Sequence, residues 1–206
     1  IPDSSPDNPI FDVTPDNLNV FGTVSNLMGQ RLDANGVPMS TSFQINQTDG
    51  SVAGVQEDYH RSHEVTELEG GGFAVTWVGS DDQVAGIPLN SAFYGRLYGA
   101  DGTALGGEFQ IASTDNPSID QQSMFINTGM VQSLEGGGFV GVWACDLYDR
   151  SSGDYHSTGE LRAQIYDADG VAQGNWFKVN TSSDVDIRSE LVNDGNGLVI
   201  ESLPDG

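Results

Sequence analysis

Three groups of aspartates have the residue types and spacing that best fit a chemical role in this sequence. Each group places two or three carboxylates within a short polar stretch. Carboxylate oxygens in flexible loops are the ligands that Ca²⁺ prefers, so we expect these stretches to be loops and at least one calcium ion to bind. For any single group, a solvated acidic surface is the favoured interpretation. The candidate ligands are Asp81, Asp82, Asp146, Asp149, Asp154, Asp184 and Asp186.

Four aromatic residues that we expect in loops could stack on the ring faces of a sugar. Such stacking would make the chain a carbohydrate-binding protein with a polysaccharide as its partner. Ordinary packing of the same rings is the alternative interpretation. The four residues are Tyr59, Tyr148, Tyr155 and Trp176.

The sequence singles out no catalytic residue. The segment His63-Glu64-Val65-Thr66-Glu67 has Glu67 where a zinc-peptidase helix needs a second histidine. The lone Cys145 has no basic neighbour in sequence, which favours a structural thiol over a nucleophile. We therefore expect a protein without enzymatic activity, although its many carboxylates leave a glycosidase pair open.

The net charge limits the classes of partner. Thirty Asp and Glu residues face seven Lys and Arg, which gives a formal net charge of −23 over 206 residues. This charge repels the phosphates of nucleic acids and of anionic membranes, so we expect no nucleic-acid partner and no membrane insertion. With one cysteine the chain forms no internal disulfide, and calcium would supply another means of stabilisation outside the cell.

An internal repeat provides the elements that must position these residues. The stretch Leu-Glu-Gly-Gly-Gly-Phe begins at Leu68 and returns 66 positions later at Leu134, each time followed by a tryptophan. Glycines permit a tight turn, and the strand expected after them has Phe73, Val75 and Trp77 on one face. The equivalent positions are Gly70, Gly71, Gly72, Phe73 and Trp77, and then Gly136, Gly137, Gly138, Phe139 and Trp143.

Each repeat is expected to contain four antiparallel strands, at 64–68, 73–79, 92–98 and 108–112 in the best-defined copy, with a long polar loop at 80–91. The third strand has a very small residue at its centre in every copy, which marks a bulge or admits an aromatic ring. Trp77 and Trp143 are natural candidates for that ring. The predicted fold is therefore all-β, built from tandem four-stranded repeats of about 66 residues, as a β-propeller-like array or a stacked β-sandwich.

The repeat also predicts the domain organisation. Residues 1–19 match no repeat and are expected to be an extended arm or linker, and residues 20–206 form the repeat domain. Within it we distinguish a part-repeat at 20–63, repeats at 64–129 and 130–197, and a part-repeat at 198–206. The strands at both ends lack partners, which predicts self-association or continuation into further repeats.

These motifs resemble the tandem repeats of large, acidic, calcium-dependent bacterial surface proteins secreted by the type I route, the RTX-like and adhesin repeats. The resemblance covers about residues 20–206, but the glycine-rich nonapeptides of a calcium β-roll do not occur. It implies an extracellular or cell-surface location and an adhesive role.

From these observations we expect a structural or adhesive module that assembles, for instance into a filament, through its end strands. The alternatives are a lectin-like β-propeller domain and, behind it, a secreted hydrolase.

Overall fold

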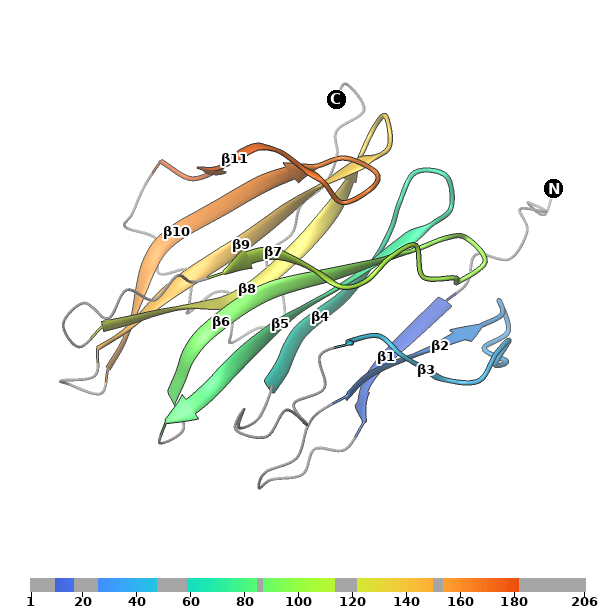
Figure 1. Ribbon diagram of the computed structural model, residues 1–206, viewed down its shortest axis with the longest axis horizontal. Coiled ribbons are helices and arrows are strands. Elements are labelled where there is room, and N and C mark those ends of the chain that lie inside the picture. Colours follow the sequence, from blue (N-terminus) through green and yellow to red (C-terminus); the bar gives the residue numbers. More distant parts are fainter. Residues whose placement is uncertain are drawn as a thin grey trace.

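The computed structural model describes residues 10–16, 26–47, 59–84, 87–113, 122–149 and 154–181, and these form three antiparallel sheets. The expected all-β fold with antiparallel sheets is confirmed for this part of the chain. The sheets lie in a row that follows the sequence, as Figure 1 shows from blue through green to orange-red. None of the described residues forms a helix long and apolar enough to cross a membrane.

The first sheet contains β1 (Ile10–Asp16), β2 (Asn26–Leu32) and the short β3 (Phe43–Gln44), in that order. β1 pairs with β2 along its whole length, from Ile10 opposite Leu32 to Asp16 opposite Asn26. Part of the segment expected to be an extended arm or linker is thus a strand of this sheet. The domain boundaries drawn from the sequence stay a prediction.

The second and third sheets share one topology, in which each strand pairs with its neighbour in sequence. The second sheet has the order β4 (Tyr59–Glu67), β5 (Phe73–Val84), β6 (Ile87–Tyr98) and β7 (Phe109–Ser113). The third sheet consists of β8 (Gln122–Leu134), β9 (Gly138–Asp149), β10 (Asp154–Tyr166) and β11 (Ala172–Lys178), in the same order.

The stretch at 80–91 is not the polar loop expected from the sequence. Ser80 pairs with Ser91 and Val84 with Ile87, so β5 and β6 continue as a two-stranded ribbon beyond the core. β9 and β10 also stay paired to their ends, with Asp149 opposite Asp154, but there β8 continues beside them, with Gln122 opposite Asp149. The loop prediction failed because it rested on polarity, whereas backbone hydrogen bonds between paired strands do not require apolar side chains.

The two glycine turns have the tight conformation that the sequence predicted. Gly70 and Gly71 have φ angles of 93° and 82°, and Gly136 and Gly137 have 95° and 89°, in the region that favours glycine. The phenylalanine after each turn stacks on the tyrosine that ends the third strand. The ring centroids lie 4.8 Å apart for Phe73 and Tyr98 and 5.0 Å apart for Phe139 and Tyr166.

The small residue in the third strand accommodates a ring, but from a different partner than expected. A Cβ atom on Gly95 would lie 3.0 Å from Cζ of Phe109 and 3.2 Å from Cδ1 of Ile111, both from the next strand of the same sheet. In the first sheet, a Cβ atom on Gly29 would likewise lie 3.0 Å from Cζ of Phe43. The expectation that Trp77 or Trp143 supplies the ring is wrong, because those side chains point into the cores between sheets.

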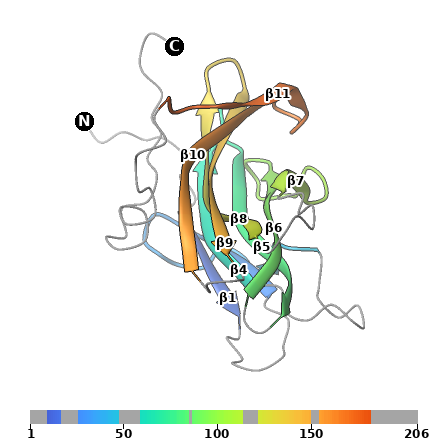
Figure 2. The same ribbon diagram turned by 90° about the vertical axis from the view of Figure 1, so that its left-hand side faces the viewer.

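Adjacent sheets pack face to face through two hydrophobic cores. The core between the first and second sheets joins Leu27 and Ile45 to Phe73, Val75 and Trp77. In the core between the second and third sheets, side chains of β5, β6 and β7 pack against side chains of β8, β9 and β10. Figure 2 looks along the row of sheets, so that their strands overlap in the view. The second core contains Ala74, Val78, Phe93, Leu97, Ile111, Ile126, Val131, Phe139, Trp143 and Tyr166.

The closest contact between the second and third sheets is that of Phe93 with Gly129 of β8. A Cβ atom on Gly129 would lie 2.8–2.9 Å from three carbons of the Phe93 ring, which is itself fully buried. Beside it, the hydroxyl of Tyr166 donates to the backbone oxygen of Ile111 at 2.7 Å, and the hydroxyl of Thr66 donates to that of Val131 at 3.0 Å. Glycine at 129 therefore sets how closely the two sheets approach.

Gly129→Ala is expected to lower the free energy of unfolding by about 1–3 kcal/mol, because the added methyl group overpacks a rigid contact. Gly106→Ala is the matched control, since a Cβ atom there meets nothing within 4 Å and the residue has no positive φ. Urea unfolding monitored by tryptophan fluorescence compares both variants with the parent. Equal stability of the two variants would contradict this packing.

Candidate functional site

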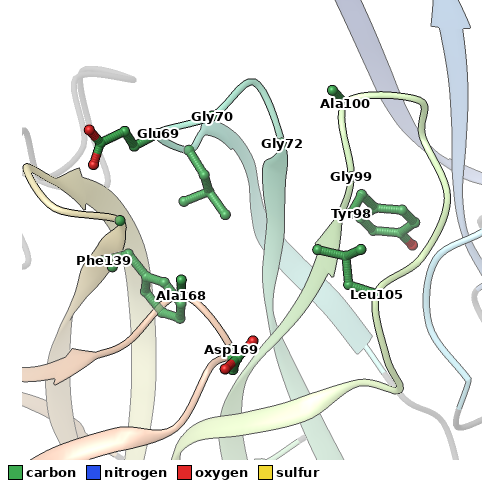
Figure 3. Close-up of a pocket in the computed structure, with 13 residues that line it drawn as sticks. Glu69, Gly70, Gly72, Tyr98, Gly99, Ala100, Leu105, Phe139, Ala168 and Asp169 are labelled. Carbon is green, nitrogen blue, oxygen red and sulfur yellow. The ribbon is translucent and has the colours of Figure 1, made fainter.

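A cleft of about 320 Å³ opens between the second and third sheets, at the end where their glycine turns lie. Leu68 and Leu105, from connections between strands of the second sheet, line it together with two buried residues, Tyr98 and Phe139. Figure 3 shows this arrangement, with Leu105 directed toward the opening and the turn that contains Ala168 on the opposite wall. The walls are thus largely apolar, and much of the remaining lining is glycine backbone.

The turn that contains Glu69 connects the two sides of this cleft. The carboxylate of Glu69 accepts a hydrogen bond of 2.7 Å from the backbone amide of Gly136 in the equivalent turn of the third sheet. Both glycines at 70 and 71 have positive φ, so the turn is tight and holds Glu69 at the rim. One carboxylate oxygen of Glu69 is engaged by this bond, while the side chain as a whole stays exposed.

The opposite wall is a second kind of tight turn, stabilised by its own aspartate. Asp167 Oδ1 accepts hydrogen bonds from the backbone amides of Asp169 and Val171, at 3.1 and 2.9 Å. The same turn occurs at Asp33, whose Oδ1 accepts from Asn35 and Val37, and these bonds lower the pKa of the Asp33 carboxyl. The turn presents Asp169 to the cleft and to an adjoining cavity of about 80 Å³ beside Leu97 and Phe109.

The rim of the cleft is acidic. Glu69 and Asp169 are exposed, and none of the described residues that line the cleft is Lys or Arg. Together with the apolar walls, this arrangement fits a ligand that carries hydrogen-bond donors around an apolar surface.

A half-buried carboxyl lies further along β4, outside the cleft. Burial of Glu64 raises the pKa of its carboxyl above the usual value of 4.5, and a hydrogen bond from the Val131 backbone opposes this shift. The exposed His63 next to it belongs to the segment considered above for zinc. Among the described residues, no group of three or more His, Cys, Asp or Glu side chains comes together to hold a metal ion.

The candidate calcium ligands lie on strands rather than in loops where the structure describes them. Asp81 and Asp82 belong to β5, Asp146 and Asp149 to β9, and Asp154 begins β10. The strand register brings Asp149 opposite Asp154 and places Asp81 opposite Asn90. Calcium binding at these positions stays a prediction. Asp184 and Asp186 lie outside the described residues.

The four aromatic residues proposed for sugar stacking lie on strands rather than in the expected loops, and they belong to two different sheets. Tyr148 and Tyr155 are register partners on the third sheet, whereas Tyr59 lies opposite Ser80 on the second. Trp176 on β11 is 51% exposed, but the guanidinium of Arg162 lies 4.4 Å from the centre of its ring. One face of that indole is therefore covered by a cation.

Sequence reasoning missed Glu69 and Asp169, the residues that give the cleft its charge. Both occur within repeated motifs, as the variable position of Leu-x-Gly-Gly-Gly and as the third residue of Asp-Ala-Asp-Gly. The repeated glycines after Glu69 predicted a turn, which the structure shows. Glu69 and Asp169 differ from the equivalent residues of the other copies because their turns face each other across two sheets. The sequence does not show which turns face each other.

Comparison with known proteins gives two similar solved structures, while no family model and no curated protein matches the chain. The first is an endo-arabinase from Bacteroides thetaiotaomicron, 9% identical with a TM-score of 0.43, over 85% of this chain and 60% of that one. The second is an exo-1,5-alpha-L-arabinanase from a bovine ruminal metagenomic library, 14% identical with a TM-score of 0.35, over 84% and 59%. This chain therefore spans less than two thirds of either protein.

This comparison corrects three expectations about function. Both similar structures are enzymes, so the expectation of a structural or adhesive module is wrong by this comparison, as is that of a protein without enzymatic activity. The associated descriptions as adhesin, filament and structural protein are wrong for the same reason. They had followed from a repeat pattern, and a repeat describes how a chain is built, whereas its function depends on the sites it bears.

Glu64→Gln is expected to raise the melting temperature at pH 7, because the half-buried carboxylate is charged there and the amide is not. Since the pKa of Glu64 is raised on folding, its favourable contribution is complete below about pH 4.5 and is lost as the pH rises through the folded pKa. The difference between variant and parent should therefore vanish in acid. Glu67→Gln, at an exposed position of the same strand, is the control. Calorimetric melts from pH 3.5 to 7.5 measure both, and an equal response of the two variants would contradict the assignment.

Proposed function

We propose that this chain acts on glycans and that the cleft between the second and third sheets binds the sugar. The observation that carries this proposal is the composition of the cleft, with apolar side chains in the walls and two carboxylates, Glu69 and Asp169, at the rim. A sugar ring has a matching chemistry, because its C–H groups pack on apolar surface while its hydroxyls donate to carboxylate oxygens. The volume of about 320 Å³ suits a single sugar unit of a longer glycan.

The acidic rim also favours a neutral glycan over an acidic one. A chain with a formal net charge of −23 repels a uronic acid or a sulfated sugar, and the described lining offers no cation to pair with it. A neutral sugar meets no such penalty. We therefore propose neutral glycans as the ligands, and an extracellular location is part of the same proposal.

The proposed scaffold for this site is a β-propeller-like array of repeated units. Equivalent details support it, since Leu27 N donates to Asn46 Oδ1 at 2.7 Å in the first sheet and Leu161 N to Asn180 Oδ1 at 2.9 Å in the third. The stacked Phe–Tyr pairs of the second and third sheets are a further example. In such an array the turns of neighbouring units line up at one end, which is where the cleft forms.

The test is a titration of the isotope-labelled chain with neutral oligosaccharides, followed by heteronuclear NMR. Arabino-oligosaccharides come first, since the two similar structures are named for arabinan-type activities. We expect millimolar binding, about −4 kcal/mol, with shifts confined to the amides at 68–72, 99–105 and 168–170. Release of reducing ends from the bound glycan is measured in parallel, and hydrolysis is the reaction we expect.

Glu69→Gln should weaken this binding by roughly tenfold, the loss of about 1.4 kcal/mol in a charge-assisted hydrogen bond. Its amide oxygen can still accept from Gly136, so the turn is kept. Glu135→Gln is the matched control, at the equivalent position of the next turn but outside the cleft lining. Binding that is absent for every neutral glycan, or equally weakened by both substitutions, would overturn the proposal.

A further inference from the structure

A small cavity of about 80 Å³, which we call the side cavity, adjoins the cleft and shares part of its lining. Leu105, Ala168 and Asp169 line both spaces (Figure 3). A water molecule takes about 30 Å³ in the liquid, so the side cavity has room for roughly two or three groups of that size. The described residues that line the side cavity alone are Leu97, Gly106, Gly107 and Phe109.

At the junction of the first and second sheets, an arginine occupies the place that corresponds to the side cavity. Arg31 is the equivalent of Leu97 in the repeat. Its guanidinium donates to the backbone oxygen of Asp101, in the turn equivalent to that of Asp169. The arginine lies so close to this turn that a Cβ atom on Gly102 would be 2.6 Å from its Cδ. Between the second and third sheets, the shorter Leu97 leaves the corresponding space open.

The turn that carries Asp169 differs from its equivalent in a second respect. In the second sheet, Asp101 accepts hydrogen bonds from the backbone amide and the hydroxyl of Thr103, both at 2.9 Å. Val171 stands at the position of Thr103 in the third sheet and has no hydroxyl to donate. Within the part of the chain that the structure describes, no group donates to the carboxylate of Asp169. Its oxygens can therefore accept hydrogen bonds from a ligand.

The side cavity is preformed, because fixed side chains hold both of its walls. Asp167 Oδ2 accepts from Gln173 Nε2 at 2.9 Å, in addition to the two backbone amides that its Oδ1 holds, and this fixes the turn of Asp169. On the opposite wall, the ring of Phe109 packs with its centroid 6.2 Å from that of Tyr166. A preformed apolar space with one polar group at its edge is typical of a pocket that gives specificity.

We propose that the side cavity binds the exocyclic hydroxymethyl group of a sugar whose ring lies in the cleft. This inference rests on the proposed function and names the class of sugar, one with a free –CH2OH group. The methylene carbon packs on Leu97 and Phe109, and the hydroxyl donates to the carboxylate of Asp169. A whole sugar ring is too large for about 80 Å³. An acetamido group fits less well, because its carbonyl oxygen needs a donor and none of the described side chains in this lining is one.

Pairs of methyl glycosides that differ only in this group test the proposal by NMR titration of the isotope-labelled chain. Methyl β-D-glucopyranoside is paired with methyl β-D-xylopyranoside, and methyl β-D-galactopyranoside with methyl α-L-arabinopyranoside. In a pair that binds, we expect the member with the hydroxymethyl group to bind roughly tenfold more tightly, from one buried methylene and one hydrogen bond. This member should also shift the amides at 106–109, and its partner should not.

Leu97→Arg should abolish the preference within a pair, because Arg31 shows that an arginine at this position fills the space. Leu97→Phe fills the side cavity without adding a charge and should have the same effect. Ile165→Arg and Ile165→Phe are the matched controls, since Ile165 is the equivalent residue of the third sheet and lines neither space. Both controls should keep the preference of the parent, and circular dichroism melts verify that each variant is folded.

The outcomes separate this inference from the proposed function. Equal affinities within every pair that binds overturn the inference but not glycan binding in the cleft. A preference that survives in folded Leu97→Arg and Leu97→Phe overturns it in the same way, as does tighter binding of the xyloside or the arabinopyranoside. If neither a methyl glycoside nor an oligosaccharide shifts the amides at 68–72, both proposals are wrong.

Discussion

The face-on contact between the Phe93 ring and the Gly129 backbone holds the second and third sheets in register. The ring is fully buried, and there is no space for a side chain at position 129. This contact fixes the distance between β8 and β6. At that distance the hydroxyl of Tyr166 reaches the backbone oxygen of Ile111, and the hydroxyl of Thr66 reaches that of Val131. The glycine turns of the two sheets then lie close enough for Glu69 to accept from Gly136. The cleft thus depends on a packing contact in the middle of the sheets.

The local structure could be predicted from the sequence because its causes are local. Alternation placed Phe73, Val75 and Trp77 on one face of a strand, and these residues do share one core. The glycines at 70 and 71 predicted a turn with positive φ, and both have it. The ribbon at 80–91 could not be predicted, because its polar composition is typical of a loop. These residues form strands only because they pair with one another, and composition does not encode that pairing.

The candidate site could not be predicted for a related reason. Glu69 and Asp169 are 100 positions apart and meet at one cleft only after two sheets have packed. The Leu-Glu-Gly-Gly-Gly-Phe motif occurs twice, so it identified a turn without showing which turns face each other across the sheets. The acidic groups that spacing did single out, such as Asp149 and Asp154, are brought opposite one another by strand register instead.

Nuclear Overhauser contacts between the ring protons of Phe93 and the α-protons of Gly129 are the most direct measurement of the central claim. The stacked arrangement predicts strong contacts between them, together with α-proton resonances of Gly129 displaced far upfield by the ring current. It also predicts a contact between the ring of Tyr166 and Ile111. A Gly129 with ordinary α-proton shifts and no contact to Phe93 would contradict the stacking of the two sheets, and with it the cleft.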